Sequence, residues 1–231
     1  MKNKNKQIFD FLGRLAANNN RDWFKEHKSE FDDLRQNWME QLDALRTKMS
    51  QWDPDLLRQP LADLPYRIYR DTRFSPDKTP YKTYFAAVLS PWGRKSFRPC
   101  YYLQMGASSW SKSGLFGGMY CPPSDVLKKV RAAIVDNIDE FEEIINRPEL
   151  KKLFPGWFGD ALKTVPKGYD RNHPQAEILK QKDFGKAHIV DDKFFLDDNW
   201  IDRTSEIFSV LKPLNDFFNY SIDEEEQRTD F

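Results

Sequence analysis

The segment "TYFAAVLSPWGRKSFRPCYYLQMG", residues 83–106, predicts the centre of the fold. It contains two runs rich in aromatic and branched residues, 83–90 and 100–106, with Pro, Gly and Ser between them. Such runs are typical of short strands. A third run, "GLFGGMY" at 114–120, follows closely, and "KAHIV" at 186–190 reads as one more strand. Successive short strands joined by turns form antiparallel sheets, so we predict one in the middle of the chain.

Helical periodicity lies on both sides of this region. Apolar residues recur at steps of three or four from Trp23 to Trp52, and again over residues 126–145, which predicts two long amphipathic helices. His27 lies on the first of these apolar seams, so we expect it to be mostly buried and hydrogen-bonded. A third helical pattern, 197–222, contains Pro213, where we expect a kink or a split. We therefore predict a single α+β domain, residues 1–231, in which N-terminal and C-terminal helices pack on the sheet.

The charges balance overall but are distributed unevenly along the chain. The 231 residues include 36 Lys and Arg and 36 Asp and Glu, so net charge gives no argument for nucleic acid. No acid occurs from Lys78 to Ser124, whereas the C-terminal "SIDEEEQRTDF" is strongly acidic. Two interpretations stay open here: a basic face built by the middle of the chain, or a basic face that the acidic segment covers.

Several classes of protein are disfavoured. No apolar run approaches the ~20 residues of a membrane span, and the N-terminus does not read as a signal peptide. Two cysteines, Cys100 and Cys121, do not suggest a disulfide framework. We expect a soluble cytoplasmic protein without a membrane partner. His27, His173 and His188 do not cluster with metal-ligand spacing, and no phosphate-loop or nucleophile motif occurs, so we expect no metal and no cofactor.

The most distinctive segment is "PYRIYRDTRFSPDKTPYKTYF", residues 65–85, in which five bases are interleaved with aromatic side chains. If residues 66–74 form a strand, Arg67, Asp71 and Arg73 share one face, where we expect linked ion pairs. Guanidinium forks held in this way match the oxygens of phosphate or carboxylate. A turn containing Asp77 and Lys78 then follows.

These residues predict a site for an anionic small molecule. Arginines in such a site could also stabilise developing negative charge, so the site could be catalytic. The candidate ligand-binding residues are Arg67, Arg70, Asp71, Arg73, Lys78, Tyr81 and Lys82. We expect Arg67, Arg73 and Lys78 to point inward and Arg70 to be structural. The competing interpretation is a network of surface ion pairs without a ligand.

Two further functions are alternatives. In a nucleic-acid-binding module, bases would stack on tyrosines beside the basic track, namely Tyr69, Tyr81, Tyr84, Tyr101 and Tyr102. The zero net charge and the absence of a known nucleic-acid module disfavour it. In a protein-interaction module, the charged face would meet a partner protein. The basic loop at residues 162–174 is a second candidate, although we favour its interpretation as a solvated turn held by prolines.

The sequence also resembles a known family. The pattern Arg67-x-x-Arg70-Asp71-x-Arg73-Phe74, followed by Asp77-Lys78 and Tyr81, is similar to the signature of domain of unknown function 2461, a family of bacteria and fungi. The likeness covers nearly the whole chain, including "NNNRDWFKEHKSEF", "FGGMYCPPSDVLKKVRAAI" and "LKTVPKGYDRNHPQAEILKQKDF". The chain departs from the family at Asn172, where an acid is expected before His-Pro. The resemblance implies the fold and directs attention to the charged segment, but it implies no particular activity, substrate or cofactor.

Overall fold

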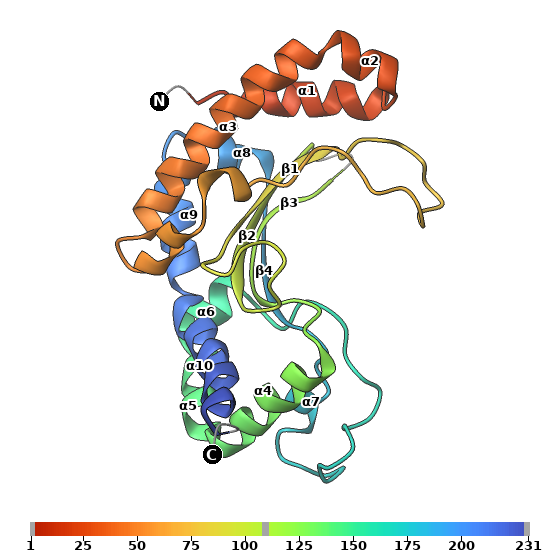
Figure 1. Ribbon diagram of the computed structural model, residues 1–231. Helices are drawn as coiled ribbons and strands as arrows, with labels where there is room; N and C mark the ends of the chain where they lie inside the picture. The colour runs from red at the N-terminus through yellow and green to blue at the C-terminus, as the bar shows by residue number, and fades with distance from the viewer. Residues whose placement is uncertain (1–2, 108–110, 229–231) are drawn as a thin grey trace. The chain divides into compact units, whose positions relative to one another are not determined.

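The computed structural model describes residues 3–107 and 111–228, with side chains described up to residue 223 (Figure 1). A sheet of four strands occupies the middle of the chain in the order β1-β2-β3-β4. The strands are β1 (Tyr84–Leu89), β2 (Cys100–Gly106), β3 (Ser113–Met119) and β4 (Phe184–Val190). The sheet is antiparallel and helices flank it in the sequence, which confirms the predicted α+β class.

The chain divides into two compact units, whose boundaries fall after Arg94, within β2, β3 and β4, and after Glu206. The first unit comprises Met1–Arg94, Tyr102–Leu115 and Ile189–Glu206. The second comprises Lys95–Tyr101, Phe116–His188 and Ile207–Phe231. That the two fold together as one domain stays a prediction. In the described part of the chain, every helix is too short or too polar to cross a bilayer.

The first unit is built around a long helix. Its helical elements are α1 (Asn5–Ala17), α2 (Arg21–Glu26), α3 (Lys28–Met49), η1 (Pro54–Arg58), η2 (Leu61–Asp63), α8 (Asp192–Leu196) and the first part of α9 (Trp200–Ser209). The rings of Trp38 and Trp200 stack in the core with centroids 6.1 Å apart. Beside them Gln41 accepts a hydrogen bond from Trp200 Nε1 at 3.0 Å and donates one to Asn5 Oδ1 at 2.9 Å. These bonds satisfy the buried amides, so a polar cluster is tolerated inside an aromatic core.

The helix predicted from Trp23 to Trp52 is broken at His27 and ends at Met49. His27 leaves helical geometry at φ −103° and ψ 14°. Its ring stacks on Trp23 with centroids 3.9 Å apart, and its Nδ1 lies 2.8 Å from the Trp23 carbonyl oxygen. The hydrogen bond is confirmed, but His27 is half-buried rather than mostly buried, because the break turns it toward the surface.

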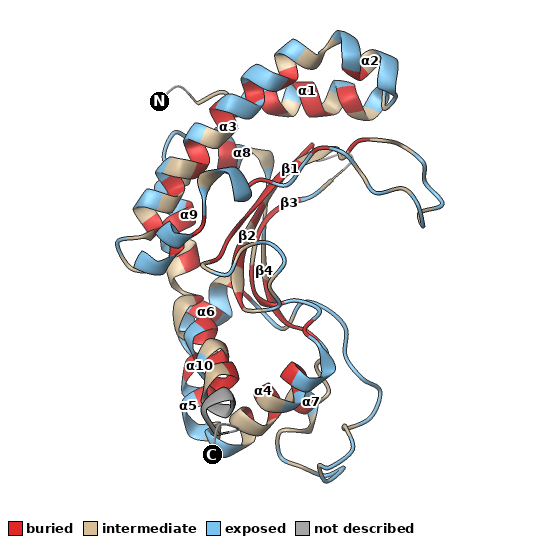
Figure 2. Ribbon diagram, in the orientation of Figure 1, coloured by how far each residue is buried: buried red, intermediate tan, exposed pale blue. Residues whose placement is uncertain are grey.

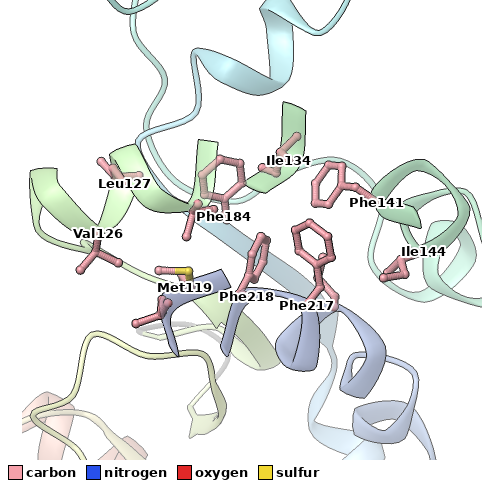
Figure 3. Packing of buried hydrophobic residues seen from close by; sticks show 12 residues of the cluster. Met119, Val126, Leu127, Ile134, Phe141, Ile144, Phe184, Phe217 and Phe218 are labelled. Atoms are coloured by element: carbon pink, nitrogen blue, oxygen red, sulfur yellow. The ribbon is translucent and has the colours of Figure 1, made fainter. Parts of the chain in front are cut away.

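The second unit has its own hydrophobic core, and Figure 2 colours its buried residues red. Its helices are α4 (Ser124–Asp136), α5 (Ile138–Ile145), α6 (Pro148–Leu153), α7 (Ala176–Leu179) and α10 (Lys212–Arg228). Phe184, Phe217 and Phe218 are among the rings that meet between these elements (Figure 3). The predicted helix over 126–145 is interrupted at Asn137, and the C-terminal helix is split just before Pro213, as expected.

A cation and an acid are buried in the second unit. Lys186 is 5% exposed, with its Nζ 2.7 Å from the Gly156 carbonyl oxygen and 3.8 Å from the centroid of the Trp157 ring. Burial lowers the pKa of Lys186 to about 8. Asp183 accepts hydrogen bonds from the backbone N–H of Cys121 and of Asp160. Asp183, which directly precedes β4, thereby joins the start of that strand to the loop that follows β3 and to the loop between α6 and α7.

Residues 64–82, which we call the charged arm, do not form the predicted strand. Isolated bridges join Pro65 to Ala87 and Tyr69 to Tyr81, with irregular backbone conformation between them. The backbone N–H of Tyr66 donates to Ala86 and that of Arg70 donates to Pro80. Pro65 and Pro80 have no N–H with which to complete a ladder, so the pairing stays discontinuous.

Candidate functional site

A pocket of about 610 Å³ lies in the first unit, against the charged arm. Its walls come from the end of α1, from the arm and from the start of β1. The lining residues are Ala16, Asn19, Arg70, Asp71, Asp77, Thr79, Tyr81, Lys82, Thr83 and Tyr84. The volume falls within the range of roughly 300–1,000 Å³ that small-molecule sites occupy. Because most of these side chains are polar, the pocket suits a polar ligand.

Arg70 holds the tip of the arm in place. Its guanidinium bonds to the Asp77 carboxylate and the Thr79 hydroxyl, and lies 3.2 Å from the Thr79 carbonyl oxygen. Thr79 in turn donates its backbone N–H to Asp77 Oδ1 at 2.9 Å and its hydroxyl to Oδ2 at 3.0 Å. The hydrogen bonds from the Thr79 backbone and the Arg70 side chain lower the pKa of Asp77 to about 2. The positive charge of Arg70 is therefore already balanced by Asp77 where its side chain lines the pocket.

Asp71 and Arg73 form a second closed pair. Asp71 Oδ1 accepts from Arg73 Nε at 3.0 Å and from the Arg73 backbone N–H at 3.2 Å, and Oδ2 accepts from Nη2 at 2.7 Å. Hydrogen bonds from the Arg73 side chain and then its backbone lower the pKa of Asp71 to about 2. This confirms the predicted ion pair between Asp71 and Arg73. Arg67 makes no direct bond to Asp71 in the described structure and contributes only its nearby charge.

Lys82 differs from these two arginines. Its side chain is half-buried, with Nζ 5.1 Å from the Tyr66 ring centroid and 5.8 Å from that of Tyr84. Among the residues that the structure describes, no carboxylate lies within ion-pair distance of it. Burial, followed by the positive charges of Arg67 and Arg94, lowers the pKa of Lys82. Lys82 is thus a half-buried cation whose near neighbours are other cations and aromatic rings.

The remaining walls are fixed by hydrogen bonds and ring packing. Asn19 forms a two-way amide pair with the backbone of Tyr81, with distances of 2.9 and 3.1 Å. The Tyr81 ring stacks on Phe24 at 4.1 Å, and the Thr83 hydroxyl bonds to that of Ser111 at 2.7 Å. The contacts of Tyr81 attach the end of the arm to α2 and to the connection that precedes it, and the Thr83 bond attaches the start of β1 to the segment before β3.

Four of the seven predicted ligand-binding residues line this pocket: Arg70, Asp71, Tyr81 and Lys82. The predicted inner set, Arg67, Arg73 and Lys78, does not. Arg73 is 76% exposed and Lys78 Nζ donates to the Thr72 carbonyl oxygen at 2.9 Å. The strand alternation on which that set was chosen is absent, because the backbone of residues 66–74 is irregular, and the set itself stays a prediction.

The structure adds lining residues that the prediction missed. Asn19, Thr79 and Tyr84 are the clearest of these. Thr79 and Tyr84 lie within or next to the charged segment, and their proximity to its bases was a usable signal. Asn19 lies in the connection between α1 and α2, and nothing in its local sequence relates it to the arm.

The tyrosines proposed for base stacking are not all accessible. Tyr81 is 5% exposed and Tyr101 is 3% exposed, so neither ring presents a face to a base. Tyr69, at 46%, is the most exposed of the five. This removes two of the five aromatic side chains on which the nucleic-acid alternative depended.

No group of three or more His, Cys, Asp or Glu side chains is placed to hold a metal ion within the described ranges. The site is therefore defined by one uncompensated lysine, two neutralised arginine–aspartate pairs and a polar wall.

These features define an α+β protein with a charged pocket built on an irregular arm beside β1. The chain matches the family described as Conserved hypothetical protein (DUF2461) over residues 7–217, and it belongs to that family. Searches of curated proteins and of solved structures gave no match.

Proposed function

We propose that the pocket binds a small anionic ligand bearing a phosphate or a carboxylate, with Lys82 as its main charged contact. The observation that carries this proposal is the half-buried Lys82 ammonium, which has no carboxylate at ion-pair distance within the described structure. A buried charge without a counter-charge is unfavourable, and a bound anion would supply that counter-charge.

The surrounding charges support an anion over a cation. Arg67 and Arg94 both act on Lys82 through their positive charge, and Arg94 is held nearby by a 2.7 Å hydrogen bond to the Pro65 carbonyl oxygen. Arg94 also pairs with Asp63 at 3.5 Å, so the positive potential at this position comes mainly from Lys82 and Arg67. Such a potential attracts anions and raises their local concentration.

The arginines of the motif have a positioning role in this proposal. Arg70 holds the arm through Asp77 and Thr79, and Arg73 holds Asp71. Each is paired with a carboxylate whose pKa is about 2, so that carboxylate is ionised near neutral pH. They shape the pocket while Lys82 provides the free charge.

The proposal is tested by titrating the protein with sulfate and with inorganic phosphate in a calorimeter, at constant ionic strength. We expect saturable binding that Lys82→Met removes and that Lys78→Met leaves unchanged. Lys78 is the matched control because it lies on the same arm, is exposed and is absent from the pocket lining. Circular dichroism of each variant verifies the fold. Equal binding by the parent and by folded Lys82→Met would refute the proposal.

A further inference from the structure

Two carboxylates in the pocket each retain room for one more hydrogen bond. A carboxylate offers about four acceptor positions, two on each oxygen. Asp71 receives two bonds on Oδ1 and one on Oδ2, all from Arg73. Asp77 receives one bond on Oδ1 and two on Oδ2, from Thr79 and Arg70. One acceptor position therefore remains on Asp71 Oδ2 and one on Asp77 Oδ1.

These positions can only accept, because the pKa of each carboxyl is about 2 and both are ionised near neutral pH. Both residues line the same pocket as Lys82. The pocket thus combines a half-buried cation that has no counter-charge with two ionised carboxylates that can each accept one more hydrogen bond.

We propose that the ligand is a phosphorylated polyol, whose phosphate faces Lys82 and whose hydroxyl groups donate to Asp71 Oδ2 and Asp77 Oδ1. This inference rests on the proposed function of the same pocket and assigns the class of its ligand.

Hydroxyl donors fit these acceptors better than an ammonium does. The charge of Asp71 is already compensated by Arg73, and that of Asp77 by Arg70. A ligand ammonium would gain little further attraction and would be repelled by these guanidinium groups and by Lys82. A neutral hydroxyl gains a charge-assisted hydrogen bond without that repulsion.

A phosphate fits the cationic side better than a carboxylate does. A phosphomonoester carries about −1.5 to −2 charges near neutral pH, against one for a carboxylate. Lys82 has two further cations, Arg67 and Arg94, acting on it. The pocket volume of about 610 Å³ accommodates a ligand of this kind with several carbons.

The experiment compares ligands of matched size on the full chain by calorimetry: glycerol 3-phosphate, n-propyl phosphate, phosphoethanolamine and glycerate. Each hydroxyl that reaches a carboxylate should improve affinity by roughly tenfold, so glycerol 3-phosphate should bind at least about tenfold more tightly than n-propyl phosphate. In Asp71→Asn and in Asp77→Asn this ratio should fall, by up to about tenfold in each, and in the double variant it should approach one. Asp55→Asn, which alters an ion-paired acid that does not line the pocket, should preserve it.

The outcomes separate this inference from the proposed function. If n-propyl phosphate binds as tightly as glycerol 3-phosphate and both require Lys82, the polyol assignment is overturned and the anion site stands. Tighter binding of phosphoethanolamine would overturn the hydroxyl assignment, and tighter binding of glycerate would overturn the phosphate. If no anion binds in a Lys82-dependent way, both proposals fail. The ligand ratio in the parent decides the matter even if an aspartate variant does not fold.

Discussion

Replacing Lys186 by Met tests whether the protein carries the free-energy cost of a buried ammonium. Lys186 is 5% exposed, and its pKa is lowered from 10.5 to about 8 by burial. At about 1.36 kcal/mol per pKa unit, a displacement of this size corresponds to at most about 3 kcal/mol. Because the native state binds the proton more weakly than the unfolded state does, this cost is fully present below pH 8.

The sign follows from proton counting. Between about pH 8 and pH 10.5 the native protein has released the Lys186 proton while the unfolded chain still holds it, so stability rises with pH. Met has a similar length and no charge, so the variant lacks this rise. At pH 7 the variant also loses the bond to Gly156 O and the contact with Trp157, which together contribute about 2–4 kcal/mol and offset its advantage. The absolute difference is therefore less informative than its change with pH.

The assay is urea unfolding of parent and Lys186→Met at about pH 7 and pH 10.5. We expect the stability of the parent relative to the variant to increase by up to about 3 kcal/mol over this interval. Lys128→Met, which alters an exposed lysine of α4, should show no such change. A constant difference between parent and Lys186→Met would show that the buried amine carries no such cost.

Three further predictions concern packing, thiol chemistry and the site. Gly159 has φ +122°, and a Cβ there would lie 2.4 Å from Asp183 Cβ, so Gly159→Ala should lower the free energy of unfolding in urea by about 2–4 kcal/mol. Gly13→Ala, in open space on α1, should raise it by about 0.5–1 kcal/mol, and similar effects of the two variants would contradict this reasoning. A chromogenic disulfide reagent should react quickly with exposed Cys121 and slowly with Cys100, whose pKa burial raises to about 12, so a fast phase surviving in Cys121→Ser would be inconsistent. Sulfate affinity should be nearly constant from about pH 4 to 8, because the pKa values of Asp71 and Asp77 are about 2. At higher pH it should fall as Lys82 loses its proton, at a pH below the ordinary lysine pKa of 10.5; if Lys82→Arg, which stays charged, loses affinity at the same pH, Lys82 is not the group responsible.

The helices and strands were largely predictable because their patterns are long and local. The runs at 83–90 and 100–106 contain β1 and β2, and the seam from Trp23 contains α3. What the periodicity could not locate were interruptions such as the one at His27, where apolar spacing continues through the break. The local sequence there contains no proline or glycine that would have indicated it.

The sequence indicated which segment contributes to the candidate pocket, but not which of its side chains line it. Its charged segment was visible in the sequence, and Arg70, Asp71 and Lys82 do line one pocket. Which bases point inward depends on backbone geometry, and Pro65 and Pro80 prevent the regular alternation that we assumed. The contribution of Asn19 depends on a contact 62 residues away, which no local pattern encodes.

Both outer strands of the sheet are bordered by irregular chain. Residues of the arm bond to β1 through Tyr66 and Ala86, and the backbone N–H of Phe158 bonds to Gly185 of β4. An uncovered strand presents a row of free N–H and C=O groups to which another molecule can add a strand, and these segments occupy part of each row. We therefore expect the charged arm to limit pairing of the β1 edge with a strand of another molecule.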